Sequence, residues 1–172
     1  MKNKETQSLP IKFEDLVSTY KERLYWHIRR MVISHQDTDD VLQNTFIKVY
    51  KNLNTFKGDS SIYTWLYRIA TNESLTFINK RARTLKISNE SLKDSLVTNL
   101  QSDPYFDGDA AQLKLQEAIA TLPPKQKQVF IMKYYDELQY NEMSTILETS
   151  EGALKASYHH AVRKITEYVT ED

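Results

Sequence analysis

Residues 149–165, TSEGALKASYHHAVRKI, carry two different faces at helical spacing. The apolar face recurs every three or four residues, as in a helix that packs one side on a core, and comprises Leu154, Tyr158, Ala161, Val162 and Ile165. The other face carries donors for phosphates or base edges and comprises Lys155, Ala156, His159, His160 and Arg163. The stretch predicts an amphipathic helix with a surface suited to nucleic acid. An ordinary solvated face on a four-helix domain is the alternative for this stretch alone.

A second, shorter helix is predicted just before this one. Residues 141–147 carry inward apolar side chains, and Ser150 is placed to cap the longer helix that follows. Two helices joined by a turn of about three or four residues match a helix-turn-helix, whose second helix enters the major groove of DNA. The adjacent His159 and His160 do not predict a metal site, because neighbouring helical side chains point about 100° apart and no third ligand completes the set.

Residues 84–110 separate two helical blocks. They are rich in Ser, Asn and Asp and contain Pro104 and Gly108, which is typical of a linker between domains. This segment is acidic, whereas residues 61–83 before it are basic. The predicted fold is all-α, with two small helical domains joined by a flexible linker and the helix-turn-helix in the second. The expected parts are an N-terminal tail, 1–12, a helical domain, 13–83, the acidic linker, 84–110, and the helix-turn-helix domain, 111–172.

The composition favours long helices and excludes several classes of protein. Only three Gly and four Pro occur in 172 residues, and no proline lies between Ile11 and Asp103. The absence of cysteine excludes disulfides and thiol catalysis. The 23 basic and 23 acidic side chains balance, which argues against a protein that coats nucleic acid by charge alone. The first ten residues lack the apolar core of a signal peptide, and no apolar run approaches the roughly 18 residues of a membrane span. We therefore expect a cytoplasmic protein without stable membrane insertion.

Two motifs stand out in the first block. DTDDVLQNTFIKVYKNLN, 37–54, is an amphipathic helix whose outer face bears the apolar Ile47, as on an ordinary surface or at a contact with a protein partner. FKGDSSIYTWLYRIATN, 56–72, is a loop and then a helix that Asp59 or Ser60 is expected to cap. Single-stranded nucleic acid requires flat rings for its bases and cations for its backbone. The outer side of this helix and the basic run after it offer such groups in Tyr67, Arg68, Asn72, Lys80, Arg81 and Arg83.

Together these motifs resemble the bacterial extracytoplasmic-function (ECF) sigma factors, the small two-domain initiation factors of RNA polymerase. The resemblance lies in DTDDVLQNTFIKVY, FKGDSSIYTWLYRIATN and LPPKQKQVFIMKYYDELQYNEMSTILETSEGALKASYHHAVRKI, which have the order and spacing of that family. It implies sigma region 2 over about 13–83 and region 4 over about 111–169. It also implies three partners: core RNA polymerase, promoter DNA and an anti-sigma protein that holds the factor inactive.

The resemblance assigns residues to three surfaces. The helix of residues 37–54 would dock on the largest polymerase subunit through Asp40, Gln43 and Asn44, beside Ile47. A non-template base of the minus-ten element would turn into a pocket framed by Phe56, Lys57, Gly58, Asp59, Ser60 and Ser61, with Tyr67, Arg68 and Asn72 beside the strand. The minus-thirty-five element would be read as duplex around Ser150, Lys155, Ala156, His159, His160 and Arg163.

Two other classes of protein account for the sequence less well. A stand-alone helix-turn-helix regulator that binds duplex DNA as a dimer explains residues 140–165 but leaves the aromatic loop and the first block without a role. An all-helical enzyme lacks support, because the sequence shows no carboxylate pair, nucleophile with a base, Gly-rich phosphate loop or metal spacing. We therefore predict a transcription initiation factor, without a cofactor or catalysis, that recognises both promoter elements and promotes melting by capturing non-template bases.

Overall fold

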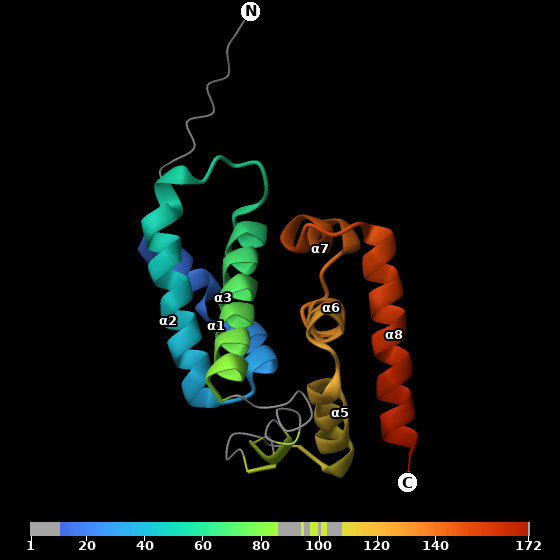
Figure 1. Cartoon of the computed structure of the whole chain (residues 1–172). Coiled ribbons are helices and arrows are strands. Elements are labelled where there is room, and N and C mark those ends of the chain that lie inside the picture. The colour runs from blue at the N-terminus through green and yellow to red at the C-terminus, as the bar shows by residue number, and fades with distance from the viewer. Residues whose placement is uncertain (1–10, 86–93, 95–96, 100, 103–107, 172) are drawn as a thin grey trace, which may run out of the picture.

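The computed structural model describes residues 11–85, 94, 97–99, 101–102 and 108–171. Within these ranges the regular elements are all helical, which confirms the predicted all-α fold (Figure 1). The helices are α1 (Phe13–Val32), α2 (His35–Asn52), the 3₁₀ turn η1 (Leu53–Thr55), α3 (Ile62–Leu85), α5 (Ala110–Thr121), α6 (Pro124–Tyr134), α7 (Tyr140–Leu147) and α8 (Glu151–Thr170). None of the described helices combines the length and the apolar content needed to cross a lipid bilayer.

The first three helices form an N-terminal unit. α1 is followed by Ile33, which adopts a positive φ of 70°, and the hydroxyl of Ser34 then accepts the backbone N–H of Asp37 at 3.3 Å to cap α2. α1 and α2 therefore turn back on each other, and both pack on α3. Leu24 and Val49 have no exposed surface in the resulting core.

The last four helices form a C-terminal unit in which α8 packs on α5, α6 and α7. α7 is followed by Glu148, whose backbone is left-handed with a φ of 50°, and the hydroxyl of Ser150 accepts the backbone N–H of Ala153 at 3.3 Å. Leu154 and Ile165 of α8 are buried against the unit. The predicted helix-turn-helix and its Ser150 cap are both confirmed.

The two units pack against each other, with α6 on α1 and α7 on α3 (Figure 1). One hydrophobic core contains side chains from both units. A buried lysine also crosses the contact, because Lys127 Nζ of α6 donates to the carbonyl of Met31 in α1 at 3.0 Å. Most of the predicted linker, 84–110, lies outside the described residues, so the domain boundaries stay predictions, although α3 extends to Leu85.

Candidate nucleic-acid interfaces

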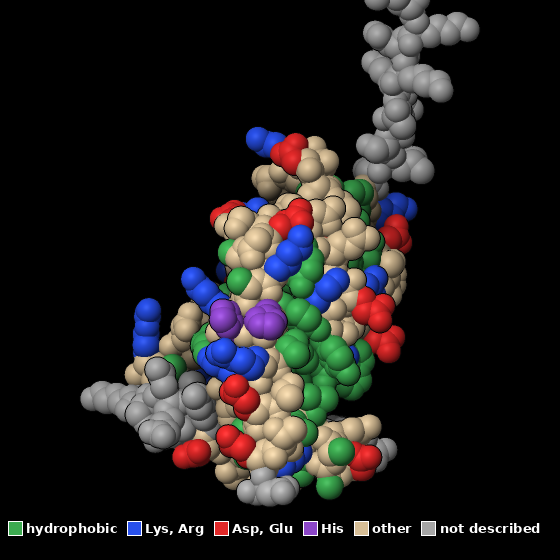
Figure 2. Space-filling model, turned by 90° about the vertical axis from the view of Figure 1, so that its right-hand side faces the viewer, with side chains coloured by type: hydrophobic (Ala, Val, Ile, Leu, Met, Phe, Trp, Pro, Cys, Tyr) green, Lys and Arg blue, Asp and Glu red, His purple; other side chains and the backbone are tan. Residues whose placement is uncertain are grey.

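The outer face of α8 presents the side chains predicted for duplex DNA. The exposed polar members are Lys155, His159, His160 and Arg163. Figure 2 shows the histidines together with lysine and arginine side chains on one face of the molecule. Lys155 Nζ lies 4.0 Å from Glu151 Oε2 and Arg163 Nε lies 3.7 Å from Glu167 Oε1, both one turn apart on the exposed surface. Such pairs contribute little, so a phosphate can displace them.

The start of α8 is open to a close approach. Ala156 is exposed, and a Cβ added to Gly152 would meet nothing within 4 Å. The oxygen of Ser150 accepts the helix-capping bond, which leaves its own hydroxyl proton to donate. Small residues and a free donor at a helix N-terminus suit contact with a phosphate.

The loop that precedes α3 is largely exposed, as predicted for Lys57, Gly58 and Asp59. Gly58 adopts a φ of 75°, which glycine reaches without strain. Phe56 packs on Trp65 with ring centroids 5.2 Å apart, so both rings are half-buried beneath the loop. The expected cap at Asp59 or Ser60 is wrong. The hydroxyl of Ser61 accepts the N–H of Thr64 at 3.1 Å and caps α3 instead.

Tyr67 was expected on the surface beside a DNA strand, and its side chain is instead buried with 1% of the residue exposed. Its ring lies 4.5 Å from His27 of α1 and 4.6 Å from Tyr63, measured between centroids. Burial raises the pKa of the Tyr67 hydroxyl, and the nearby Asp136 raises it further. The prediction for Tyr67 is wrong because α1 and the turn after α6 cover a side of α3 that the spacing of apolar residues in the sequence assigns to solvent.

Arg68 and Asn72 are exposed, as predicted, but they face the C-terminal unit. They line a groove of about 820 Å³ between α3 and the helix-turn-helix, opposite Leu147, Glu148 and Leu154. Arg68 Nη2 forms an ion pair with Glu148 Oε1, in which the arginine side chain is 44% exposed and the glutamate 70%. An exposed pair of this kind contributes at most about 1 kcal/mol.

The basic run at the end of α3 lies apart from this groove. Lys80 and Arg83 are exposed, whereas Arg81 is half-buried and its Nη1 pairs with Asp37 Oδ2 of α2. Lys80 and Arg81 line a hollow of about 570 Å³ between α2 and α3. The structure therefore groups these two cations with the α2 surface and not with Arg68.

The α2 surface holds the residues predicted to bind polymerase. The exposed members are Asp40, Gln43, Asn44 and Ile47. The first three line the same hollow as Lys80 and Arg81, so acidic, amide and basic groups meet at one place. Ile47 is 45% exposed and Tyr50, which the sequence did not single out, is 67% exposed. Apolar groups beside mixed charges suit a protein partner better than DNA.

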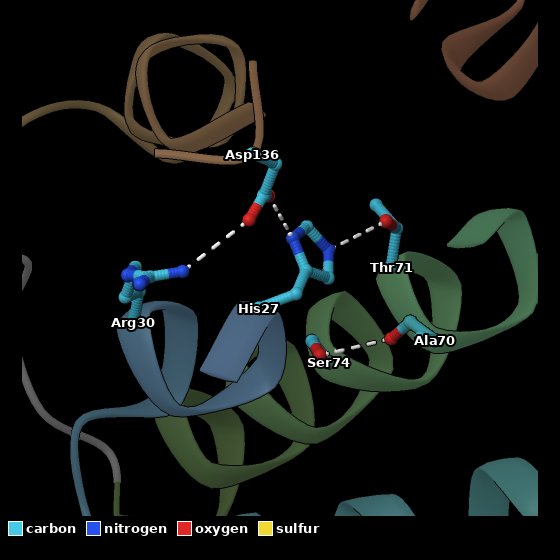
Figure 3. Close-up of polar contacts among 6 residues, drawn as sticks. All are labelled: His27, Arg30, Ala70, Thr71, Ser74 and Asp136. Atoms are coloured by element: carbon cyan, nitrogen blue, oxygen red, sulfur yellow. Dashed lines mark hydrogen bonds and ion pairs between the residues drawn. The ribbon is translucent and has the colours of Figure 1, made fainter. Parts of the chain in front are cut away.

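A buried polar network, which the sequence did not predict, joins the two units (Figure 3). Asp136, in the turn after α6, has a side chain only 4% exposed, and its Oδ2 lies 2.7 Å from Nδ1 of the fully buried His27. Its Oδ1 accepts from Arg30 Nη1 at 3.3 Å. The other ring nitrogen of His27, Nε2, lies 2.9 Å from Thr71 Oγ1 on α3. No local signal could reveal this network, because His27 and Asp136 are 109 residues apart.

No group of three His, Cys, Asp or Glu side chains that could hold a metal ion occurs in the part of the chain that the structure describes.

Comparison with known proteins identifies the family. The Sigma-70 region 2 profile matches residues 16–84 and the Sigma-70, region 4 profile matches residues 112–165. A helical unit with region 2 followed by a helix-turn-helix unit with region 4 defines the Sigma-70 class of RNA polymerase sigma factors. The chain is 32% identical over 163 residues to the ECF RNA polymerase sigma factor SigW of Bacillus subtilis, which covers 88% of this chain and 87% of that protein. It belongs to the ECF family of RNA polymerase sigma factors.

Further likenesses agree with this. The RNA polymerase sigma-H factor of Pseudomonas aeruginosa is 27% identical, over 87% of this chain and 81% of that protein. The sigma factor RpoE of Bartonella quintana, solved in complex with the anti-sigma factor NepR, has the same fold with a TM-score of 0.70 and 19% identity, over 93% of this chain and 98% of that one. The predicted family and function are thereby confirmed. The protein is a promoter-recognising initiation factor of transcription, and sigma factors are not enzymes.

Proposed function

We propose that this chain, when bound to core RNA polymerase, reads the minus-thirty-five element as duplex through α8 and the minus-ten element as a parted strand through the loop of residues 56–61, Arg68 and Asn72. The observation that carries the proposal is the placement of two chemically different surfaces on two separate units. α8 is the second helix of a helix-turn-helix with exposed donors, as duplex reading requires. The loop and Arg68 offer an exposed cation and a nearby pair of rings, as strand binding requires.

Strand capture supplies part of the free energy for melting. Opening a duplex costs about 1.4 kcal/mol per base-pair step in lost stacking. Stacking of an unpaired base on protein returns about 1 to 3 kcal/mol. One or two captured bases are thus enough to nucleate the bubble, and the polymerase stabilises the rest of it.

Core polymerase is required because the free chain is a weak DNA binder. Its net charge is zero, so it has little general attraction to phosphates. Its two DNA surfaces gain affinity only when polymerase holds them at the spacing of the two promoter elements. We place the polymerase contact on α2, at Asp40, Gln43, Asn44 and Ile47. Its site of action is the cytoplasm, where polymerase and promoters are.

A protein antagonist is part of the proposal. One solved structure of similar fold is the sigma factor RpoE of Bartonella quintana in complex with the anti-sigma factor NepR. A second, with a TM-score of 0.65, is CnrH in complex with the cytosolic domain of CnrY. They support regulation of this chain by an anti-sigma factor. A protein that co-purifies with the chain from its host and blocks its transcription in a purified system would meet this expectation.

The decisive experiment is transcription in vitro with core polymerase and a library of promoter fragments. We expect transcripts that share two sequence elements and depend on the chain. A chain that binds duplex tightly as a dimer and never joins polymerase would instead be a stand-alone regulator.

Single substitutions should distinguish the roles of the two surfaces. Lys155→Gln should weaken binding of the closed, unmelted complex and lower the salt dependence of that binding by about one counterion, because it removes a contact to duplex. Arg68→Gln should leave closed-complex affinity near wild type and slow the appearance of permanganate-reactive thymines in the bubble. Lys21→Gln, an exposed cation of α1, is the matched control and should change neither. Equal loss of both steps in each variant would contradict the assignment.

A further inference from the structure

Two carboxylates of the C-terminal unit each contact an arginine of the N-terminal unit. Asp136 contacts His27 and Arg30, and Glu148 contacts Arg68. The acidic partner comes from the C-terminal unit in both cases, from the segments that flank α7. The basic partners come from α1 and α3. The contact between the units is therefore complementary in charge.

We propose that His27 and Arg30 form an anion site for a backbone phosphate of the parted promoter strand, and that Asp136 occupies this site in the closed protein in place of the phosphate. In the same way, Glu148 pairs with Arg68 in the closed protein and takes the place of a phosphate there. This inference rests on the proposed function and extends it, because it adds α1 to the strand surface and explains what closes that surface.

The geometry of the Asp136 site fits a phosphate. The two carboxylate oxygens are contacted separately, at 2.7 Å by His27 Nδ1 and at 3.3 Å by Arg30 Nη1. A phosphodiester also presents two unesterified oxygens, and arginine binds such pairs well. Thr71 holds the imidazole from behind through Nε2 at 2.9 Å, so the ring is oriented before any ligand arrives. Arg30 also lies over the Tyr135 ring, with Cζ 4.5 Å from the centroid.

The site is continuous with the strand surface already proposed. Thr71 is next to Asn72 in sequence and lies one helical turn from Arg68, and residues three apart on a helix are neighbours. The docked C-terminal unit covers this side of α3, where Tyr67 is buried. When polymerase separates the units, Arg30, His27 and Arg68 lose their carboxylates together. The two guanidinium groups freed in this way can bind the unesterified oxygens of a phosphate, with the His27 ring beside Arg30.

A simple clasp between domains is the competing explanation, and the two make different predictions. If Arg30 serves only to hold the units together, neither Arg30→Gln nor Asp136→Asn changes strand binding once polymerase has separated the units. If Arg30 also binds the strand, the two variants differ once the units are apart. Removal of the carboxylate then costs nothing, whereas removal of the cation costs a phosphate contact.

The first measurement uses the holoenzyme and a fork-junction promoter with a single-stranded minus-ten segment, chosen from the transcription library. Arg30→Gln should lower affinity about tenfold, because a hydrogen bond to a charged group is lost. It should also reduce the slope of log affinity against log salt by about 0.7, the value for one phosphate on a single strand. Asp136→Asn and the control Lys21→Gln should leave affinity and slope unchanged, and Arg30→Lys should retain most of the slope. An unchanged slope in Arg30→Gln, or an equal loss in Asp136→Asn, overturns the proposal.

The second measurement uses the free full-length chain and a fluorescent oligonucleotide with the same non-template sequence. Asp136→Asn should raise affinity several-fold, and Glu148→Gln should raise it less, because its ion pair is exposed. Glu148→Gln disturbs no buried group and so tests masking even where Asp136→Asn unfolds. If neither variant binds the oligonucleotide more tightly than wild type, the proposed masking by carboxylates is wrong. A wild-type chain that supports no transcription with core polymerase would instead refute the proposed function, and the oligonucleotide measurement would still report on the anion site.

Discussion

Lys127 shows how one side chain links docking of the units to pH. Its ammonium is buried at the contact and donates to the carbonyl of Met31, one of the last four carbonyls of α1. These carbonyls have no partner within the helix, and a cation near them is favoured by the helix dipole. Burial acts in the opposite direction and lowers the pKa of Lys127 from 10.5 to about 8. The contact therefore satisfies a helix end at the cost of desolvating a charge.

This lowered pKa predicts how stability varies with pH. Between about pH 8 and 10.5 the unfolded chain binds the Lys127 proton more tightly than the folded chain, so the free energy of unfolding rises with pH across that window. Below pH 8 the full penalty applies, on the order of 3 kcal/mol. In urea unfolding, the difference in the free energy of unfolding between wild type and Lys127→Met should change by an amount of that order between pH 7.5 and 10.5. Wild type should gain stability relative to the variant as the pH rises. Lys125→Met, an exposed lysine of the same helix, should follow wild type. Parallel curves for wild type and Lys127→Met would contradict the linkage.

Helix α8 depends on a local cap for its position in the helix-turn-helix. The left-handed Glu148 ends α7, and Ser150 starts α8 two residues later. The first N–H groups of a helix have no internal partners, and the Ser150 oxygen satisfies that of Ala153. The start of α8 is therefore held in place relative to α7, together with the exposed side chains that we propose for the groove contact.

We expect Ser150→Ala to destabilise the protein by about 1 kcal/mol, the usual cost of a lost N-cap. In thermal unfolding this corresponds to a decrease in Tm of about 2 to 4 °C for a chain of this size. Thr166→Ala is the control, because Thr166 is exposed on α8 and its hydroxyl only bonds back to the carbonyl of Val162. A Tm equal to that of the control would mean that tertiary contacts alone define the start of α8.

The whole molecule is a closed arrangement in which the C-terminal unit covers one side of α3, whereas the outer face of α8 is open. The side of α3 that bears Tyr67 lies under the C-terminal unit, whereas Lys155 and Arg163 on α8 are exposed. Apolar core, the Lys127 bond and the Asp136 network all contribute to closure. Removal of one partner of a buried charge pair costs about 3 to 5 kcal/mol, against at most about 1 kcal/mol for an exposed pair, so Asp136→Asn should weaken the closed arrangement more than Glu148→Gln does.

The lack of cysteine makes this closure measurable. Glu22→Cys on α1 and Thr170→Cys at the end of α8 introduce two exposed labelling positions, one on each unit. Energy transfer between dyes at these sites should decrease when core polymerase binds. In the free chain it should decrease partly in Asp136→Asn, because the apolar contacts persist. Energy transfer that is unchanged by polymerase would mean that the units stay docked in the holoenzyme.

The candidate surfaces could be predicted to different extents. The exposed face of α8 follows from its apolar stripe, because Leu154, Ala161 and Ile165 pack inward and their opposite neighbours then meet solvent. Tyr67 could not be placed in this way. Its helix has one apolar stripe in the sequence but is covered on more than one side, by α1 and by the C-terminal unit. In the sequence, Lys80 and Arg81 belong to a basic run with Arg83. The packing of α3 on α2 nevertheless places them beside Asp37 and Asp40.

The chain itself determines its helices, their caps and its helix-turn-helix, because these depend on residues within a few positions of one another. The same residues suffice to indicate a sigma factor with two DNA surfaces. Only tertiary structure decides that Asp136 meets His27 and that Lys127 meets the end of α1. These partners lie 109 and 96 residues apart. The reason is that such contacts follow from how the faces of separate helices fit together, and the spacing of residues within each helix does not specify that fit.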